Sequence, residues 1–145
     1  MRVPIRVDYG VRALVDLAIN GNESVPVRSV DISKRTAIPK AYLAQVLHAL
    51  KMDGFVSSTR GPSGGHLLAR RSSEIKISDV MHCLDGKENL IKCFDDVGFC
   101  CNVPTCAQRE VWQDVEKVVY DLLASITIND LVEKTSKMTT EVSFR

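Results

Sequence analysis

The sequence predicts a mainly α-helical fold with a small β-hairpin, followed by a long C-terminal helix. Two apolar repeats at helical spacing lie near the N-terminus, on either side of a short polar segment. Two strand-like runs then flank a turn rich in Gly and Pro, residues 60–66, and a broad apolar stripe covers residues 111–126. A chain of 145 residues can bury one core with an appendage, but not two independent cores.

Three helices are expected before the hairpin. The first covers residues 9–19, and a short second one covers residues 27–35. After a turn at residues 36–38, Pro39 suits the first position of the third helix, since that position needs no backbone N–H. The third helix buries Leu43, Val46, Leu47 and Leu50 and turns Lys40, Ala41, Ala44, Gln45 and His48 outward.

The hairpin completes a winged helix-turn-helix. Its strands are expected at residues 55–59 and 66–69, around a turn that begins at Arg60. The third helix fits a major groove about 12 Å wide, and glycines in the wing let its backbone approach a narrow minor groove. We therefore expect DNA contacts from Lys40, Ala41, Tyr42, Gln45, Arg60, Ser63 and Gly64.

The charges divide the chain into a basic and an acidic half. Residues 1–71 contain 11 Lys or Arg against 5 Asp or Glu, a balance of +6. Residues 72–145 contain 8 against 13, a balance of −5. A basic half is the electrostatic footprint of phosphate contact, so we expect double-stranded DNA as its partner. Charges scattered by chance on solvated faces are the alternative interpretation.

Four cysteines lie within 14 positions: Cys93, Cys100, Cys101 and Cys106. No run of 18 apolar residues and no signal-peptide pattern occurs, so we expect a soluble, cytoplasmic protein without membrane contact. Thiols stay reduced in that compartment, and an odd total of five cysteines favours metal or redox chemistry over a disulfide framework. The fifth, Cys83, is interpreted as a small buried hydrophobic residue on a short helix.

The apolar stripe of residues 111–126 is expected on a helix of about 20 residues. It is too broad to be covered by one small winged domain, so we assign it to the seam of a homodimer in preference to an internal core. The expected seam residues are Trp112, Val115, Val119, Leu122 and Ile126.

Four segments are expected along the chain. Residues 1–86 form the winged helix-turn-helix domain, and residues 87–105 form a cysteine-rich sensor loop. Residues 106–135 form the dimerisation helix and a return segment, and residues 136–145 form a polar, mobile tail.

Four strings, in this order and spacing, are shared with a known family: DYGVRAL at residues 8–14, IPKAYL at 38–43, RGPSGG at 60–65 and ITINDL at 126–131. Through them the chain resembles, over nearly its whole length, the bacterial winged-helix regulators typified by IscR, NsrR, RirA and CymR. The resemblance implies a cytoplasmic homodimer that regulates transcription. Several of these regulators carry an iron-sulfur cluster on three cysteines in the loop before the dimer helix.

The ligand set that the resemblance implies here is Cys93, Cys100 and Cys106, with Cys101 as the alternative to Cys100. Thiolates suit a four-iron or a two-iron cluster, [4Fe-4S] or [2Fe-2S], and three of them leave one ligand position open.

The fourth ligand is expected to differ from that of IscR-like members. Those members place a histidine three residues after the third cysteine, whereas this chain has Arg109, which cannot ligate. In an NsrR-like arrangement an aspartate of the partner subunit fills the position, and Asp8 stands in the matching place. A cap on the first helix is the alternative role for Asp8. His66 replaces the usual tyrosine and is expected beneath the wing.

The expected function is that of a homodimeric DNA-binding transcription regulator, and we expect a repressor. Its operator affinity would depend on an iron-sulfur cluster that senses nitric oxide, oxygen and redox state, or iron-sulfur status. One alternative is a zinc-stabilised winged-helix module that binds a protein partner, and another is a cluster-free thiol redox regulator. An enzyme is not expected, because no catalytic Ser/His/Asp or Cys/His set and no phosphate-binding glycine motif occurs.

Overall fold

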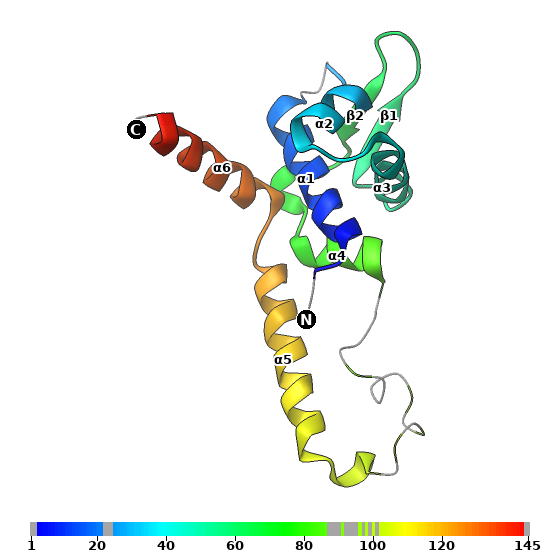
Figure 1. Cartoon of the computed structure of the whole chain (residues 1–145), viewed down its shortest axis with the longest axis vertical. Coiled ribbons are helices and arrows are strands. Elements are labelled where there is room, and N and C mark those ends of the chain that lie inside the picture. The colour runs from blue at the N-terminus through cyan, green and yellow to red at the C-terminus, as the bar shows by residue number, and fades with distance from the viewer. Residues whose placement is uncertain are drawn as a thin grey trace.

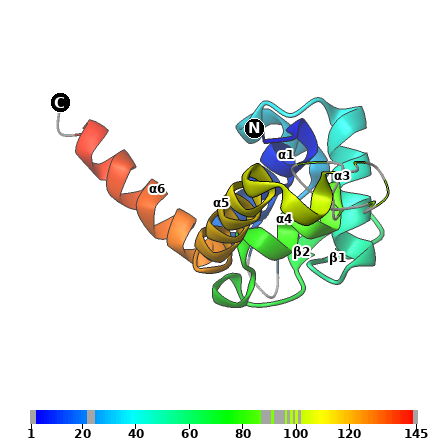
Figure 2. The ribbon, with the colours of Figure 1, turned by 90° about the horizontal axis from the view of Figure 1, so that it is seen from below.

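Helices and one hairpin form a winged domain, from which two further helices extend (Figure 1). The computed structural model describes residues 3–21, 25–86, 91, 96, 98, 100 and 102–143. Figure 2 shows the same molecule from below, nearly along α5, with α6 projecting from the domain. The elements are α1 (Ile5–Asn20), α2 (Ser29–Thr36), α3 (Lys40–Met52), β1 (Val56–Thr59), β2 (Gly65–Leu68), η1 (Ser72–Glu74), α4 (Ile77–Asp85), η4 (Val103–Thr105), α5 (Ala107–Ala124) and α6 (Ile128–Ser143).

The core lies between α1, α2, α3 and α4, and it includes a residue from far along the chain. Leu14, Ile32 and Leu43 are 0% exposed, and so is Ile128 at the start of α6. The segment before α6 pairs with the segment before α4: the amide of Ile77 donates to the Ile126 carbonyl (3.0 Å), and that of Ile128 donates to the Ile75 carbonyl (2.9 Å). The beginning of α6 therefore shares a core with residues on the other side of the expected boundary at residue 86.

The helix-turn-helix forms at the expected place, with small shifts. Ala37 turns the chain between α2 and α3 in the left-handed region, at φ 56°. Pro39 is extended and caps α3, so it precedes the first helical residue instead of being that residue. The α2 helix begins at Ser29, because Val27 instead exchanges two backbone hydrogen bonds with His66, of 2.9 and 2.8 Å.

The first helix begins earlier than expected. Its cap is Pro4, and Asp8 is the fourth residue inside it, so the interpretation of Asp8 as a helix cap is wrong. The physical reason is that Val7, only 3% exposed, extends the buried stripe by one turn toward the N-terminus.

The C-terminal part differs most from expectation. The α5 helix ends at Ala124, so Ile126 lies beyond it and not on its apolar stripe. Residues 136–143 of the expected tail are helical. Their hydroxyl side chains suggest a loop, but in α6 they bond the carbonyls four residues back, as Thr135, Ser136, Thr139 and Thr140 do at 2.8–3.1 Å. Within the described part of the chain, no helix is both long and apolar enough to cross a bilayer.

The β-hairpin is antiparallel and short. Its register pairs Val56 with Leu68 and Thr59 with Gly65, which leaves residues 60–64 as the tip of the wing. Both expected strands are confirmed. The first begins one residue later than expected, and the second is shifted by one residue toward the N-terminus.

Candidate nucleic-acid interface and sensor elements

The outward face of α3 consists of Lys40, Ala41, Ala44, Gln45 and His48, and we call this set the recognition face. All five are exposed, whereas Leu43, Val46, Leu47 and Leu50 are at most 2% exposed. The helix contains no acidic residue. The structure gives Lys40, Gln45 and His48 no hydrogen-bond or ion-pair partner among the described residues. Polar groups on this face are thus available to an external anion or base.

Arginines on neighbouring elements are neutralised within the chain. Arg12 pairs with Asp8 (2.7 Å) and Arg28 with Asp31 (2.9 Å). Arg71 pairs in the same way with Glu74 (2.7 Å). Such exposed pairs contribute little to stability, but they reduce the positive potential of the surfaces that carry them.

Tyr42 does not lie on the recognition face, although it was expected to contact DNA. Its ring is half-buried and meets the Tyr9 ring of α1 edge to face, with 5.2 Å between the ring centres. Tyr42 therefore joins α3 to α1, and its contact with DNA stays a prediction.

The wing is joined to α2 through His66. Its imidazole Nε2 lies 2.9 Å from the Ser29 hydroxyl and its Nδ1 lies 3.0 Å from the Ser58 hydroxyl. Burial lowers the pKa of His66, and the nearby Lys51 ammonium lowers it further. The expected position beneath the wing is confirmed. A side chain at Gly65 would lie 2.6 Å from the Val27 carbonyl oxygen, so only glycine allows this close approach.

The tip of the wing borders a groove. Its volume is about 670 Å³, and it separates the first turn of α2 from the tip. Ser63 and Gly64, both expected to contact DNA, line the wing side, and Arg28 lines the opposite side. Arg60, at the start of the tip, is exposed.

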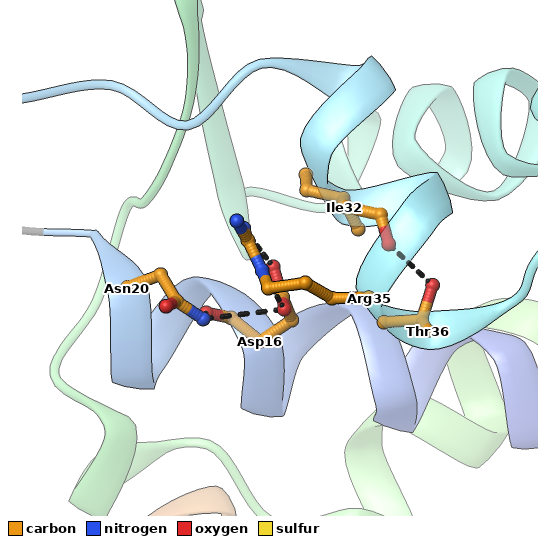
Figure 3. Close-up of polar contacts among 5 residues, drawn as sticks. All are labelled: Asp16, Asn20, Ile32, Arg35 and Thr36. Carbon is orange, nitrogen blue, oxygen red and sulfur yellow. Dashed lines mark hydrogen bonds and ion pairs between the residues drawn. The ribbon is translucent and has the colours of Figure 1, made fainter.

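An ion pair between the buried carboxylate of Asp16 and Arg35 fixes α1 against α2 and was not found by sequence reasoning (Figure 3). Asp16 is 7% exposed, and Arg35 donates to its two carboxylate oxygens at 2.7 and 2.8 Å. Asn20 adds a third hydrogen bond of 3.2 Å. The hydrogen bonds to Asp16 raise the pKa of Arg35, so the guanidinium stays charged. The sequence signal was an acid between Val15 and Leu17 in an apolar stretch, which predicts a buried partner.

The structure describes two of the three expected cysteine ligands. Cys100 and Cys106 are half-buried free thiols, and Cys106 caps the N-terminus of α5. Cys93 and Cys101 lie outside the described residues. Among the residues that are described, no three His, Cys, Asp or Glu side chains are grouped as a metal site.

Asp8 lies on the surface of α1. Arg12 donates to both of its carboxylate oxygens, at 2.7 and 3.0 Å, and the Asp8 side chain is 36% exposed. The Arg12 guanidinium also lies 5.9 Å from the centre of the Tyr9 ring. Asp8 is therefore accessible and is linked through Arg12 to the Tyr9–Tyr42 contact.

Cys83 packs against the core, as expected, although it is half-buried. Its thiol faces the Ala49 carbonyl of α3 at 3.8 Å. Burial, together with Asp53, raises the pKa of Cys83 to about 12. It therefore remains a thiol and is a poor metal ligand at neutral pH.

The apolar stripe of α5 is largely open to solvent. Val118 is 66% exposed, Leu122 59% and Trp112 42%, while Val115 and Val119 are half-buried. No residue of this helix is buried. The α5 helix thus has an uncovered apolar surface.

Comparisons with known proteins agree with this geometry. The family model described as "Rrf2: Iron-dependent Transcriptional regulator" matches residues 4–134. The chain is 35% identical over 132 residues to the HTH-type transcriptional regulator IscR of Photorhabdus laumondii, covering 91% of this chain and 79% of the relative. The solved structure of T. potens IscR is similar at 30% identity and TM-score 0.75, covering 93% and 88% of the two chains. That of CymR, described as the global cysteine regulator of B. subtilis, is similar at 25% identity and TM-score 0.77, covering 92% and 98%.

Proposed function

The chain belongs to the Rrf2 family of DNA-binding transcription regulators, and from this membership we propose that it is a cytoplasmic homodimer whose operator affinity is set by an iron-sulfur cluster. Members of the family such as IscR bind such clusters, whereas CymR does not. The observation that carries the DNA-binding part is the recognition face, which has no acidic residue and no partner among the described residues, next to an exposed wing.

The roles of the recognition face and wing follow from their chemistry. Gln45 pairs with adenine, and Lys40 with guanine or a phosphate. The short Ala41 side chain lets α3 approach the bases. Arg60 enters a narrow minor groove, where the negative potential is strongest, while Ser63 and Gly64 approach the backbone.

A second copy of the chain is the proposed cover for α5. Burying one large apolar side chain is worth about 1.5–3 kcal/mol, so pairing Trp112, Val118 and Leu122 across a twofold axis favours a dimer. Two winged domains joined in this way would bind half-sites about 34 Å apart.

The proposed cluster ligands are Cys93, Cys100 and Cys106, with Cys101 as the alternative to Cys100, and Asp8 of the partner subunit. The described donors fit this chemistry, because Cys100 and Cys106 are free thiols and the Asp8 carboxylate is accessible. A bound cluster would supply iron that reacts with nitric oxide or oxygen. A carboxylate is a harder donor than thiolate and binds cluster iron less firmly. Nitric oxide or oxygen would therefore displace it more readily.

Two contact chains support coupling between the loop and α3. The last turn of α4 directly precedes the loop, and a Cβ built on Gly10 of α1 would collide with Leu84 of that turn and lie 3.7 Å from Val46 of α3. The same turn places Cys83 against the α3 carbonyl of Ala49. The second chain runs from Asp8 through Arg12 to the Tyr9–Tyr42 contact. A displacement of Leu84 or Cys83, or a change at Asp8, therefore acts on the position of α3.

The test is an anaerobic absorption spectrum with iron and sulfide analysis, followed by operator titrations with and without the cluster. We expect a brown protein whose affinity changes when the cluster is removed. Variants that lack Cys93, Cys100 or Cys106 should lose the cluster, whereas Asp8→Ala should retain part of it with an altered spectrum and faster loss in air. A colourless protein with stoichiometric zinc would contradict the cluster and favour the zinc-stabilised module. A metal-free protein whose operator affinity follows thiol oxidation would favour the CymR-like alternative.

DNA contact is tested with separate variants. Gln45→Ala should cost about 1–3 kcal/mol at one base position, and Arg60→Ala should weaken binding most at sites with an A/T-rich minor groove. Parent-like affinity of both variants for a selected operator at about 0.15 M salt would contradict the assignment.

A further inference from the structure

The recognition face has three polar side chains, Lys40, Gln45 and His48, and only His48 has not been given a role. Successive helical residues are rotated by about 100°, and the four buried leucine and valine residues of α3 define the inward direction. On this projection Ala41 and Met52 lie nearest the outward line. Gln45 and His48 flank that line at equal angles, about 30° on either side, whereas Lys40 and Lys51 lie toward one edge.

His48 is free to bind an external group. Its side chain is exposed, and among the described residues it has no hydrogen-bond or ion-pair partner. This distinguishes it from His66, whose ring nitrogens both face serine hydroxyls. The small residues Ala41 and Ala44 precede it on the same face, so the helix backbone can come close to a surface and carry His48 with it.

The axial distance between Gln45 and His48 is similar to the step between successive base pairs of DNA. Three residues rise by about 4.5 Å along a helix, which is close to the 3.4 Å step between base pairs. A helix that places Gln45 at one base pair therefore places His48 near the next. The imidazole N–H is a donor, and the major-groove edge of guanine offers two acceptors, N7 and O6.

We propose that His48 is a second base-contacting residue of α3 and that it selects a guanine adjacent to the base contacted by Gln45. This inference rests on the operator binding proposed above and adds a specificity determinant to it. Lys40 and Lys51, at the edge of the outward arc, contact the phosphates that border the groove.

The experiment begins with an operator selected from random duplexes by the full-length parent protein. Affinities are then measured on every single base-pair substitution of that operator, for the parent, His48→Ala and the matched control His82→Ala. His82 is exposed on α4, so its replacement removes the same side chain away from the recognition face.

For the parent, replacing the selected guanine should weaken binding about 5- to 150-fold, the range of one good base contact. His48→Ala should lose this preference at that position in each half-site and keep the others, whereas His82→Ala should match the parent. His48→Asn should move the preferred base at the same position from guanine to adenine, because an amide pairs with adenine. A merely structural role for His48 would not produce this exchange.

Three outcomes would overturn the proposal. His48→Ala could keep the parent's full base profile, or it could lose affinity equally at every position, which would indicate a phosphate contact. His82→Ala could change the profile as His48→Ala does. A parent protein without sequence preference would instead overturn the operator binding on which the proposal rests. Matching thermal unfolding of parent and His48→Ala shows that the fold is intact.

Discussion

The winged domain and α5 treat their apolar side chains in opposite ways. In the winged domain Leu14, Ile32 and Leu43 are 0% exposed, whereas α5 has no buried residue and its Val118 is 66% exposed. Burial of apolar side chains therefore stabilises the fold of the winged domain. The apolar side chains of α5 would gain the same stabilisation only by packing against a partner. In the proposed dimer, folding and assembly would therefore use separate parts of this sequence, and the following variants test that separation.

The largest expected effect is on assembly. A Val118→Asp, Leu122→Asp variant places charges on the exposed stripe, where burial of each parent side chain would be worth about 1.5–3 kcal/mol. Self-association measured by sedimentation should weaken by at least about 100-fold, while the circular dichroism of the chain is retained. Lys117→Asp, on the polar side of the same helix, should leave the dimer intact. A dimeric double variant, or a parent that is monomeric at micromolar concentration, would contradict α5 as the seam.

The next effect is on the core, at its contact with α6. Ile128→Ala removes a fully buried side chain and should lower the free energy of unfolding by about 2–5 kcal/mol in urea titrations. Val142→Ala, near the other end of α6, should have almost no effect because Val142 is 74% exposed. Equal unfolding midpoints for both variants would show that α6 is not part of the winged domain in solution.

A smaller effect is expected from the α1–α2 ion pair. Asp16→Ala leaves Arg35 without its partner and should cost about 2 kcal/mol, less than a fully buried pair because the Arg35 side chain is 40% exposed. Asp31→Ala, which breaks the exposed pair with Arg28, should leave the unfolding curve unchanged. Equal unfolding free energies of the two variants would contradict a larger contribution of the Asp16–Arg35 pair than of the Arg28–Asp31 pair.

The smallest effect concerns pH. The pKa of His66 is lower in the folded protein than its ordinary value of 6.5, so the unfolded chain binds a proton more readily. Stability from this residue is therefore present above about pH 6.5 and decreases as the pH falls through the folded-state pKa. The difference in unfolding free energy between the parent and His66→Gln should shrink between pH 7 and pH 5. A difference that stays constant over this range would contradict the role of His66 burial.

Most of the winged domain was predictable because its local and global signals agree. The buried stripe of α3, Pro39 before that helix and the glycine-rich turn all point to the same arrangement. The bounds shifted where tertiary pairing decided them, as when Val27 paired with His66 instead of starting α2.

The parts that could not be predicted depend on contacts distant in sequence. Nothing in the local pattern shows that Ile128 enters a core formed by residues 7–84, or that Asp16 meets Arg35. The local pattern also does not show that the Tyr42 ring packs against Tyr9 of α1 and so lies off the recognition face. The C-terminal part of α6 was not predicted, because the hydroxyl groups of residues such as Thr139 and Thr140 occur in both loops and helices.

The backbone pairing at the start of α6 has a mechanical consequence. Hydrogen bonds at Ile126 and Ile128 attach the C-terminal end of α5 to the winged domain, so the helix behaves as a lever whose fulcrum lies beside α4. An 18-residue helix is about 27 Å long. A tilt of about 5° at that fulcrum moves the far end, where Cys106 begins the helix, by about 2 Å. In the proposed twofold dimer, a small displacement beside the cysteine loop would in turn rotate each wing and α3 as a rigid unit against fixed DNA half-sites.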